Sequence, residues 1–322
     1  MWRSAVSKRS NVKHRTNTDG PNPRQPCPCG SGKRYKACHG AKGGPGDTVA
    51  TRPFQGLVAE CELIALREFV PSATVTLPVE GSRQVLLGTV LPMVVAALVR
   101  SADQALVGAQ TQTRSGDVSR DLGGALRWAL TAEPGEVLPT VPTGGAGTDD
   151  GGDRLQDLLP VDADLRPEIH ADFGWWIPEG TEASGDVALA LERANAAVLP
   201  TRRLEADGVR AAYWADAGDT AHLRWVRPEP EDQLLAALAR LSMAGGLDFG
   251  EGSRFAGSFR AHGVLVPVWD LDPESHPQEW EKPVVEFNVR LDEALASTES
   301  QPLSESERRA VHGLRGRQVT LR

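Results

Sequence analysis

Lysine is scarce in this sequence, and the positions of the few lysines exclude whole classes of enzyme from most of the chain. Five of the six lysines lie at or before Lys42, so Lys282 is the single lysine of the remainder. Kinases, P-loop nucleotidases and Schiff-base enzymes each need a lysine in a defined setting. The neighbours of Lys282, which are Trp280, Glu281 and Pro283, belong to no such motif. The sequence therefore argues against lysine-dependent chemistry in the larger part of the chain.

Long hydrophobic runs are also missing. The longest uncharged apolar region, Val85 to Val99, has 15 residues and contains Pro92, whereas a membrane-spanning helix needs about 20 apolar residues. No apolar run follows the basic start of the chain within the first 50 residues, so neither a signal peptide nor a lipidation motif is expected. We therefore expect a cytoplasmic protein whose thiols stay reduced.

What is present is enough for a substantial core. The 322 residues are 40% hydrophobic and 24% charged, which is typical of globular proteins and excludes collagen-like and wholly disordered chains. At about 150 residues per domain, this length suggests about two domains, or one large domain with appendages.

The charge of the chain is divided unevenly. The formal net charge is −8, but residues 1–52 hold 11 lysines and arginines against two acidic residues, which gives +9 there and −17 in the rest. A basic arm can bind nucleic acid, the ribosome surface or an acidic protein through contacts that weaken with salt. It can equally stay a solvated tail or fold against its own acidic body. Charge alone does not choose among these partners.

Three of the four cysteines fall within 13 residues that end in Cys38-His39. Cys27, Cys29, Cys38 and His39 supply three sulfurs and one nitrogen, the ligand number of tetrahedral zinc. Because protein fills all four positions, such a zinc ion is structural. Metal binding would contribute most of the folding free energy of so short a segment. The C-x-C and C-H spacing is tighter than in common zinc fingers, so a redox or chance cluster stays the alternative.

The fourteen residues from Cys27 to Gly40 read CPCGSGKRYKACHG and resemble the SEC-C motif. This motif is named for the C-terminus of the translocation ATPase SecA and is found as an appendage on many otherwise unrelated bacterial proteins. The resemblance implies zinc bound by Cys27, Cys29, Cys38 and His39. In SecA the module contacts the chaperone SecB and the ribosome, so a SecB-like chaperone, the translocase or the ribosome is implied as partner. The chain carries no SecA-like motor, which leaves the partner open.

The composition predicts five parts, with a Gly-rich insertion at 140–154 inside the body. These parts are a disordered basic arm (1–22), the SEC-C zinc module (23–41), a flexible linker (42–52), an α+β globular body (53–293) and a C-terminal linker with a short helix (294–322). The predicted fold class is α+β, a mixed sheet with several helices preceded by a small tethered zinc module. The insertion leaves open whether the body is one domain or two.

Hydrophobic periodicity predicts the helices and strands of the body. The expected helices are Glu60–Phe69, Ser119–Leu130, Asp186–Val198 and Glu231–Met243, with a last helix starting at Ser304, where Ser304 and Glu307 match a capping box. The expected strands are Ala73–Val79, Val85–Val90, Ala105–Gln112, Ile169–Ile177, Ala211–Ala215, His222–Val226, Phe255–Phe259, Val264–Trp269 and Val284–Val289.

The body also shows a resemblance of its own. Its segments Pro53–Leu57 and Glu60–Pro71 are similar to those of an uncharacterised family of actinobacterial proteins that often carry SEC-C at one end. This resemblance implies an architecture for most of the chain and brings no known activity.

An enzyme stays open as an alternative, in the form of a hydrolase or nuclease with its active site in the body. His170 and Asp172 alternate on an expected strand beside Trp175 and Trp176, where they could form an acid–base pair or a metal corner. We favour a histidine on the polar face of a sheet, because no third metal ligand has recognisable spacing.

Two further groups of residues receive a structural interpretation. Cys61 lies in an apolar-periodic helix, which predicts a buried and unreactive thiol. Asp270 and Asp272 share one face of a strand end, but Pro273 follows directly, which favours a turn over a divalent-ion site. The sequence identifies no partner for His222, His262 or His276.

The function predicted from the sequence is therefore that of a zinc-binding cytoplasmic protein. Its SEC-C module is expected to dock the α+β body onto a protein partner. The alternatives are the hydrolase or nuclease of the body and nucleic-acid binding through the basic arm.

Overall fold

The computed structural model describes residues 50–112, 114–142, 153–178 and 180–317. The expected basic arm, the SEC-C zinc module with Cys27, Cys29, Cys38 and His39, and most of the linker lie outside the described residues. Residues 143–152 of the Gly-rich insertion lie outside them as well.

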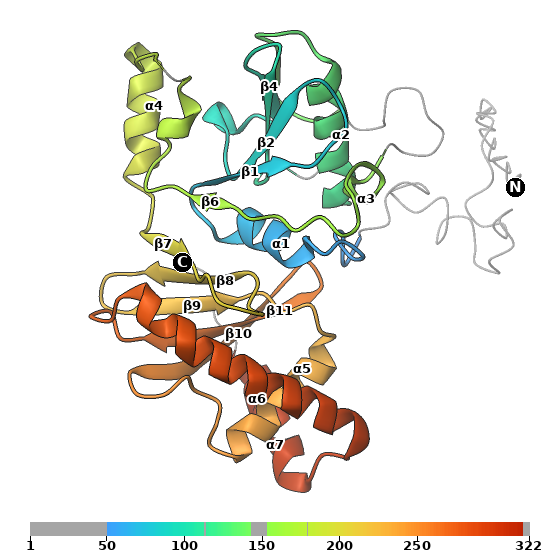
Figure 1. Cartoon of the computed structure of the whole chain (residues 1–322), viewed down its shortest axis with the longest axis vertical. Coiled ribbons are helices and arrows are strands. Elements are labelled where there is room, and N and C mark those ends of the chain that lie inside the picture. The colour runs from blue at the N-terminus through green and yellow to red at the C-terminus, as the bar shows by residue number, and fades with distance from the viewer. Residues whose placement is uncertain (1–49, 113, 143–152, 179, 318–322) are drawn as a thin grey trace, which may run out of the picture. The chain divides into compact units, whose positions relative to one another are not determined.

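The first sheet has six strands in the order β5-β3-β4-β2-β1-β6 (Figure 1). Only β2 and β4 run parallel, and all other neighbours are antiparallel, which makes the sheet mixed as predicted. The strands are β1 (Ala73–Leu77), β2 (Gln84–Gly88), β3 (Ala97–Val99), β4 (Gln104–Gly108), β5 (Val137–Leu138) and β6 (Glu168–Ile169).

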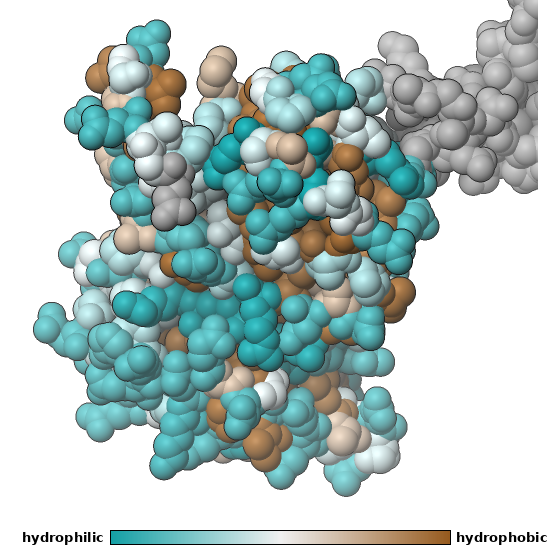
Figure 2. Space-filling model, turned by 45° about the horizontal axis from the view of Figure 1, so that its top comes forward, coloured by the Kyte–Doolittle hydropathy of each residue, from teal (hydrophilic) through white to brown (hydrophobic). Residues whose placement is uncertain are grey.

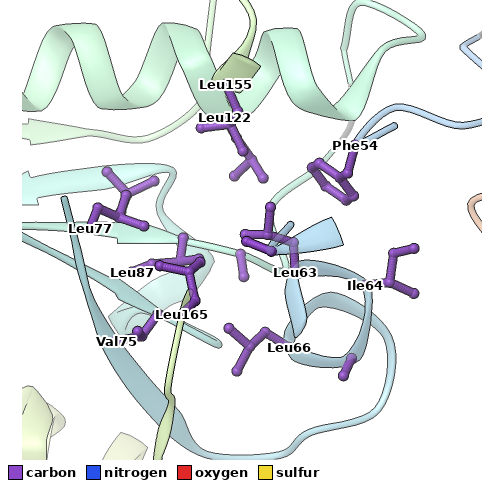
Figure 3. Packing of buried hydrophobic residues seen from close by; sticks show 14 of the residues in the cluster. Phe54, Leu63, Ile64, Leu66, Val75, Leu77, Leu87, Leu122, Leu155 and Leu165 are labelled. Carbon is purple, nitrogen blue, oxygen red and sulfur yellow. The ribbon is translucent and has the colours of Figure 1, made fainter. Parts of the chain in front are cut away.

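Two helices share a core with one face of this sheet. They are α1 (Glu60–Glu68) and α2 (Val118–Thr131), and the single-turn helix α3 (Leu155–Leu158) packs against α2. Figure 3 shows side chains of α1, α2 and α3 converging on those of β1 and β2. Because alternate strand residues point to one face, the sheet contributes Val75 and Leu87 to this core.

The other face of the first sheet is covered only in part. A small cluster of Leu91, Val95 and Leu106 packs there with Trp175. Leu91 and Val95 flank the 3₁₀ turn η2 (Pro92–Val94), and Trp175 lies in a second one, η3 (Gly174–Trp176). Helix α4 (Gly185–Asn195) follows η3 along the chain.

The second sheet is antiparallel, with the order β10-β11-β9-β8-β7. Its inner aromatic core contains Trp225, Trp269 and Phe287 and includes residues of three helices, whereas Tyr213 and Val266 belong to the core of α1. Helix α1 thus lies between the two sheets (Figure 1). The strands are β7 (Thr201–Arg203), β8 (Ala212–Asp216), β9 (Ala221–Trp225), β10 (Ser253–Ala261) and β11 (Val264–Leu271). The helices are α5 (Glu231–Met243), α6 (Glu281–Ser300) and α7 (Glu305–Gly316). The turn η4 (Pro277–Trp280) precedes α6.

Several predicted elements are confirmed. Helix α5 has the predicted bounds, and α1 ends one residue earlier than predicted. The capping box of α7 forms, since Ser304 Oγ accepts from the Glu307 amide at 3.2 Å and Glu307 Oε2 accepts from the Ser304 amide at 2.6 Å. The α+β class is confirmed. No helix in the described part of the chain is both long and apolar enough to cross a membrane.

The predicted strand Val284–Val289 is wrong, because these residues lie in α6. Val284, Phe287, Leu291 and Ala294 recur at helical spacing, and all four are buried. Packing of this stripe overrides the strand preference of valine and phenylalanine. Residues 294–300, expected in a linker, form the last part of the same helix.

The predicted strand Ile169–Ile177 is also wrong beyond its first residue. Strand β6 ends at Ile169, and η3 follows at Gly174. The cause is local, because Asp172 Oδ1 accepts a hydrogen bond from the Gly174 amide at 2.7 Å and turns the chain.

Candidate functional site

The described residues contain no group of three or more histidine, cysteine, aspartate or glutamate side chains that could hold a metal ion. Cys61, the one cysteine among them, is free and buried, as predicted. Burial first, and the nearby Glu60 carboxylate second, raise the pKa of its thiol to about 12. Because the thiolate is the nucleophile, burial and the raised pKa disfavour reaction of Cys61 at neutral pH.

The structure does not join His170 and Asp172 into an acid–base pair. His170 Nε2 lies 2.8 Å from Thr74 Oγ1 on the neighbouring strand, whereas Asp172 Oδ1 accepts from the Gly174 amide in the turn that leads into η3. Nearby, Ser72 Oγ accepts from Trp175 Nε1 at 2.9 Å and donates to the Asp172 carbonyl at 2.6 Å. The hydrogen bonds around His170 therefore hold β1, β6 and η3 together.

Asp270 and Asp272 face different partners. Asp270 Oδ1 lies 3.1 Å from His222 Nδ1, and its Oδ2 lies 2.7 Å from the Arg254 guanidinium. Asp272 Oδ1 accepts from the Glu274 amide at 3.0 Å, the turn that Pro273 predicted. Sequence reasoning missed the histidine contact because strand register alone brings β9 and β11 together.

The other two unassigned histidines also have partners. His262 Nε2 lies 2.7 Å from Glu68 Oε1, a contact between the β10–β11 turn and α1. His276 Nδ1 accepts from the Gln278 amide at 3.4 Å. The Glu68 contact joins residues 194 positions apart, and the sequence carries no signal for it.

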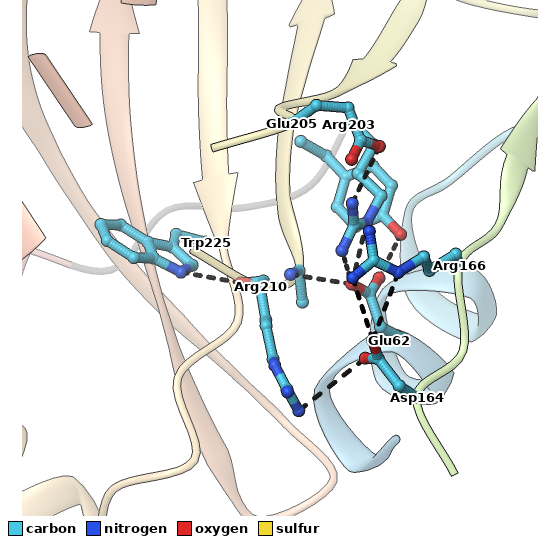
Figure 4. Close-up of polar contacts among 9 residues, drawn as sticks. Glu62, Asp164, Arg166, Arg203, Glu205, Arg210 and Trp225 are labelled. Atoms are coloured by element: carbon cyan, nitrogen blue, oxygen red, sulfur yellow. Dashed lines mark hydrogen bonds and ion pairs between the residues drawn. The ribbon is translucent and has the colours of Figure 1, made fainter. Parts of the chain in front are cut away.

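Glu62 on α1, which is 3% exposed, is the most deeply buried charged residue in the described part of the chain (Figure 4). Its carboxylate accepts from Arg203 Nε at 2.9 Å and Nη2 at 2.8 Å, and from the Ala211 amide at 3.0 Å. The Tyr213 hydroxyl donates to its other oxygen, and burial raises the pKa of that hydroxyl well above its usual value. Four donors thus satisfy one buried carboxylate, which ties α1 to β7 and β8.

A cavity of about 330 Å³ adjoins this network, between α1 and the second sheet. The Arg227 guanidinium lies in its wall, over the Trp225 ring at 4.8 Å from the centroid. Arg227 donates to Glu229 at 3.0 and 2.5 Å and to Asn288 Oδ1 at 2.8 Å. Glu60, also in the wall, pairs with Arg52 through two bonds of 2.7 Å. Arg227 and Glu60 therefore both have partners, while the lining as a whole holds five carboxylates and two guanidiniums.

Arg52 falls in the expected linker, and the structure places it in the body. Besides Glu60, its guanidinium donates to the Pro228 carbonyl at 2.7 Å. The Ala50 amide also donates to the Gly116 carbonyl at 3.0 Å. Residues 50–52 are therefore bonded to the body.

Two parts of the chain match known families. Residues 24–41 match the SEC-C motif, which includes the four candidate zinc ligands. Residues 53–322, the greater part of the chain, match the family of unknown function DUF5926, so the chain belongs to that family. Neither the curated proteins nor the solved structures contain a match to this chain.

Proposed function

We propose that this protein binds a structural zinc ion through its SEC-C module and uses that module to dock its α+β body onto a protein partner. The observation that carries the proposal is the donor set of Cys27, Cys29, Cys38 and His39 inside the SEC-C match at residues 24–41. A SecB-like chaperone, the translocase and the ribosome are the partners that the motif suggests.

The chemistry of the donor set fits zinc. Three thiolates and one imidazole complete a tetrahedral shell and leave no open position, as in structural zinc sites. Three thiolates on Zn²⁺ give a formal charge of −1, and Lys33, Arg34 and Lys36 supply positive charge within the same segment. These features support a zinc ion that stabilises a docking module.

Zinc content tests the first half of the proposal. The full-length protein, purified under reducing conditions, is expected to contain one zinc ion per chain by elemental mass spectrometry. Cys29→Ser should lose most of the zinc, because it removes one of the four ligands. Cys61→Ala is the matched control: it removes a buried cysteine outside the motif and should keep the zinc. A wild-type protein without zinc would refute the metal site.

Docking is tested by what co-purifies with the full-length protein from native lysate after nuclease treatment. Cys29→Ser and a variant lacking residues 1–22 separate the zinc module from the basic arm. If chaperone, translocase or ribosomal proteins no longer co-purify with Cys29→Ser but still co-purify with the variant lacking residues 1–22, docking through the module is supported. If these proteins are lost only from the variant lacking residues 1–22, and their binding to the wild type weakens steeply with salt, partner binding is assigned to the arm instead. An unchanged list in both variants would place the function in the body.

A further inference from the structure

The turn η2 presents strained, exposed apolar residues on the thinly covered face of the first sheet. Met93 and Val94 both have φ of +57°, and their side chains are 91% and 53% exposed. A positive φ is rare for residues other than glycine and is an outlier for a β-branched residue. Strain of this kind persists where the surrounding structure imposes it, and it clusters at functional sites.

Helix α4 is a second unusual feature on the same side. None of its eleven residues is buried, and Val187 is half-exposed. A helix of this length is marginal by itself, because most helical stability in proteins comes from packing of one face. Val187 and Leu191 lie one turn apart on the same side of the helix, so α4 carries two apolar side chains with little cover.

The turn η3 links these two features into one surface. Trp176 Nε1 donates to the Val90 carbonyl at 2.8 Å, just before η2. The Phe173 amide donates to Asn195 Oδ1 at 2.8 Å, at the C-terminal end of α4, one turn beyond Leu191. We call Met93, Val94, Trp176, Val187 and Leu191 the η2–α4 surface. Figure 2 shows hydrophobic residues over α4, at the upper left, set among hydrophilic ones.

The charged residues from η3 to the end of α4 are predominantly acidic, and one further basic group, Arg100, donates to the Trp175 and Trp176 carbonyls of η3 at 2.9 and 3.1 Å. From residue 172 to residue 198, the charged residues that the structure describes are four acidic and one basic, and all five are exposed. They are Asp172, Glu182, Asp186, Glu192 and Arg193. Like charges facing each other oppose association, so two copies of this surface would repel, whereas a basic partner would be attracted.

We propose that the η2–α4 surface binds a basic amphipathic segment of a partner protein. The apolar side chains of that segment would cover Met93 and Val187, and its lysines or arginines would face Glu182 and Asp186. This is the recognition mode in which an amphipathic helix lays its apolar face on an apolar surface. The binding is independent of the zinc module and goes beyond the function proposed above.

The test uses the full-length protein and a fluorescein-labelled 18-residue helical peptide of leucine and lysine. Fluorescence anisotropy should show that Met93→Ser/Val187→Ser lowers the affinity by at least about tenfold, because burial of two apolar side chains is lost. Glu182→Lys should weaken binding by a few fold and reduce its salt dependence. All three side chains are exposed, so circular dichroism should show folded variants.

Leu189→Ser is the matched control, because Leu189 is as exposed as Val187 and lies two positions further on the helix, on the opposite side. It should leave the affinity unchanged within about twofold. The proposal would be overturned if Leu189→Ser and the double variant lost affinity equally, or if the double variant lost none. A dimer in sedimentation that the double variant abolishes would assign the surface to a second copy and overturn it too.

Discussion

The carboxylate of Glu62 on α1 accepts two hydrogen bonds from the guanidinium of Arg203 on β7, although 141 positions separate the two residues. The side chains are 4% and 7% exposed, so both charges lie in the interior. Burial alone would lower the pKa of Arg203, but the attraction of Glu62 raises it. Each charge therefore depends on the other, and the pair ties the first half of the body to the second.

Removal of one partner should destabilise the body strongly. Glu62→Ala leaves the buried Arg203 guanidinium with only the exposed Glu205 carboxylate as an ionic partner, so we expect the free energy of unfolding to fall by about 3–5 kcal/mol. Urea denaturation followed by circular dichroism measures this change. The double variant Glu62→Ala/Arg203→Ala should lose less than the sum of the single losses, because the two residues are coupled.

The control for this prediction is an exposed ion pair in the same body. Arg166 pairs with Asp164 at 3.2 Å, and the Arg166 side chain is 73% exposed. Arg166→Ala should cost at most about 1 kcal/mol, since water and salt screen such pairs. Equal costs for Arg166→Ala and Glu62→Ala would contradict the role assigned to burial.

The Glu68–His262 contact predicts a pH dependence of stability. The hydrogen bond from His262, the largest effect, lowers the pKa of Glu68 below its usual value, against an opposing effect of burial. A carboxylate with a lowered folded-state pKa stabilises the fold above its unfolded-state pKa, about 4.3, and this stabilisation is lost as the pH falls through the folded-state value. Glu68→Gln should therefore be less stable than wild type near pH 6.

Denaturation of the two proteins from pH 6 down to about pH 3 checks this prediction, since the carboxylate titrates in that range. The difference in free energy of unfolding should shrink as the pH falls. Glu274→Gln, which alters an exposed carboxyl group, should show little difference at any pH. A gap between Glu68→Gln and wild type that grows toward low pH would contradict the prediction.

Thiol reactivity should divide the four cysteines into two groups. Cys61 is buried and its pKa is raised to about 12, so it should react with a disulfide reagent only after denaturation. Cys27, Cys29 and Cys38 should react when a chelator removes the zinc, because thiolates bound to metal are protected. The native Cys61→Ala variant should show the same number of reactive thiols as the native wild type. Three thiols that react at once without chelator would argue against bound zinc.

Relief of backbone strain should stabilise η2. Val94→Gly removes the side chain that makes a φ of +57° unfavourable, and we expect a gain of about 1 kcal/mol in the free energy of unfolding. Val187→Gly places glycine in a regular helix instead and should cost about 0.5–1 kcal/mol. Urea denaturation distinguishes the two. Destabilisation by Val94→Gly would show that its side chain contributes to packing.

Short-range patterns predicted much of the secondary structure. Helix α5 has apolar residues at helical spacing behind two acidic residues, and Ser304 with Glu307 marks the start of α7; both features act within a few residues of the chain. The same approach failed at Val284–Val289, where strand-forming residues lie in α6. There the deciding contacts come from α5 and the second sheet, which no local pattern contains.

The candidate sites divide in the same way. The four proposed zinc ligands stand close together in the sequence, so their spacing alone carries the prediction. The partners of His222 and His262, in contrast, are 48 and 194 positions away. Their contacts depend on strand register and on how α1 packs against a hairpin.

Composition and residues near one another in the chain predicted the α+β class and the SEC-C motif, and they show that residues 1–52 are basic and the rest acidic. Only the tertiary structure decided that α1 lies between two sheets, that Glu62 meets Arg203, and that η2 and α4 flank η3. These contacts join residues that are far apart in the sequence, so no local pattern contains them. They form because a buried charge needs an opposite charge nearby and apolar side chains are more stable when packed.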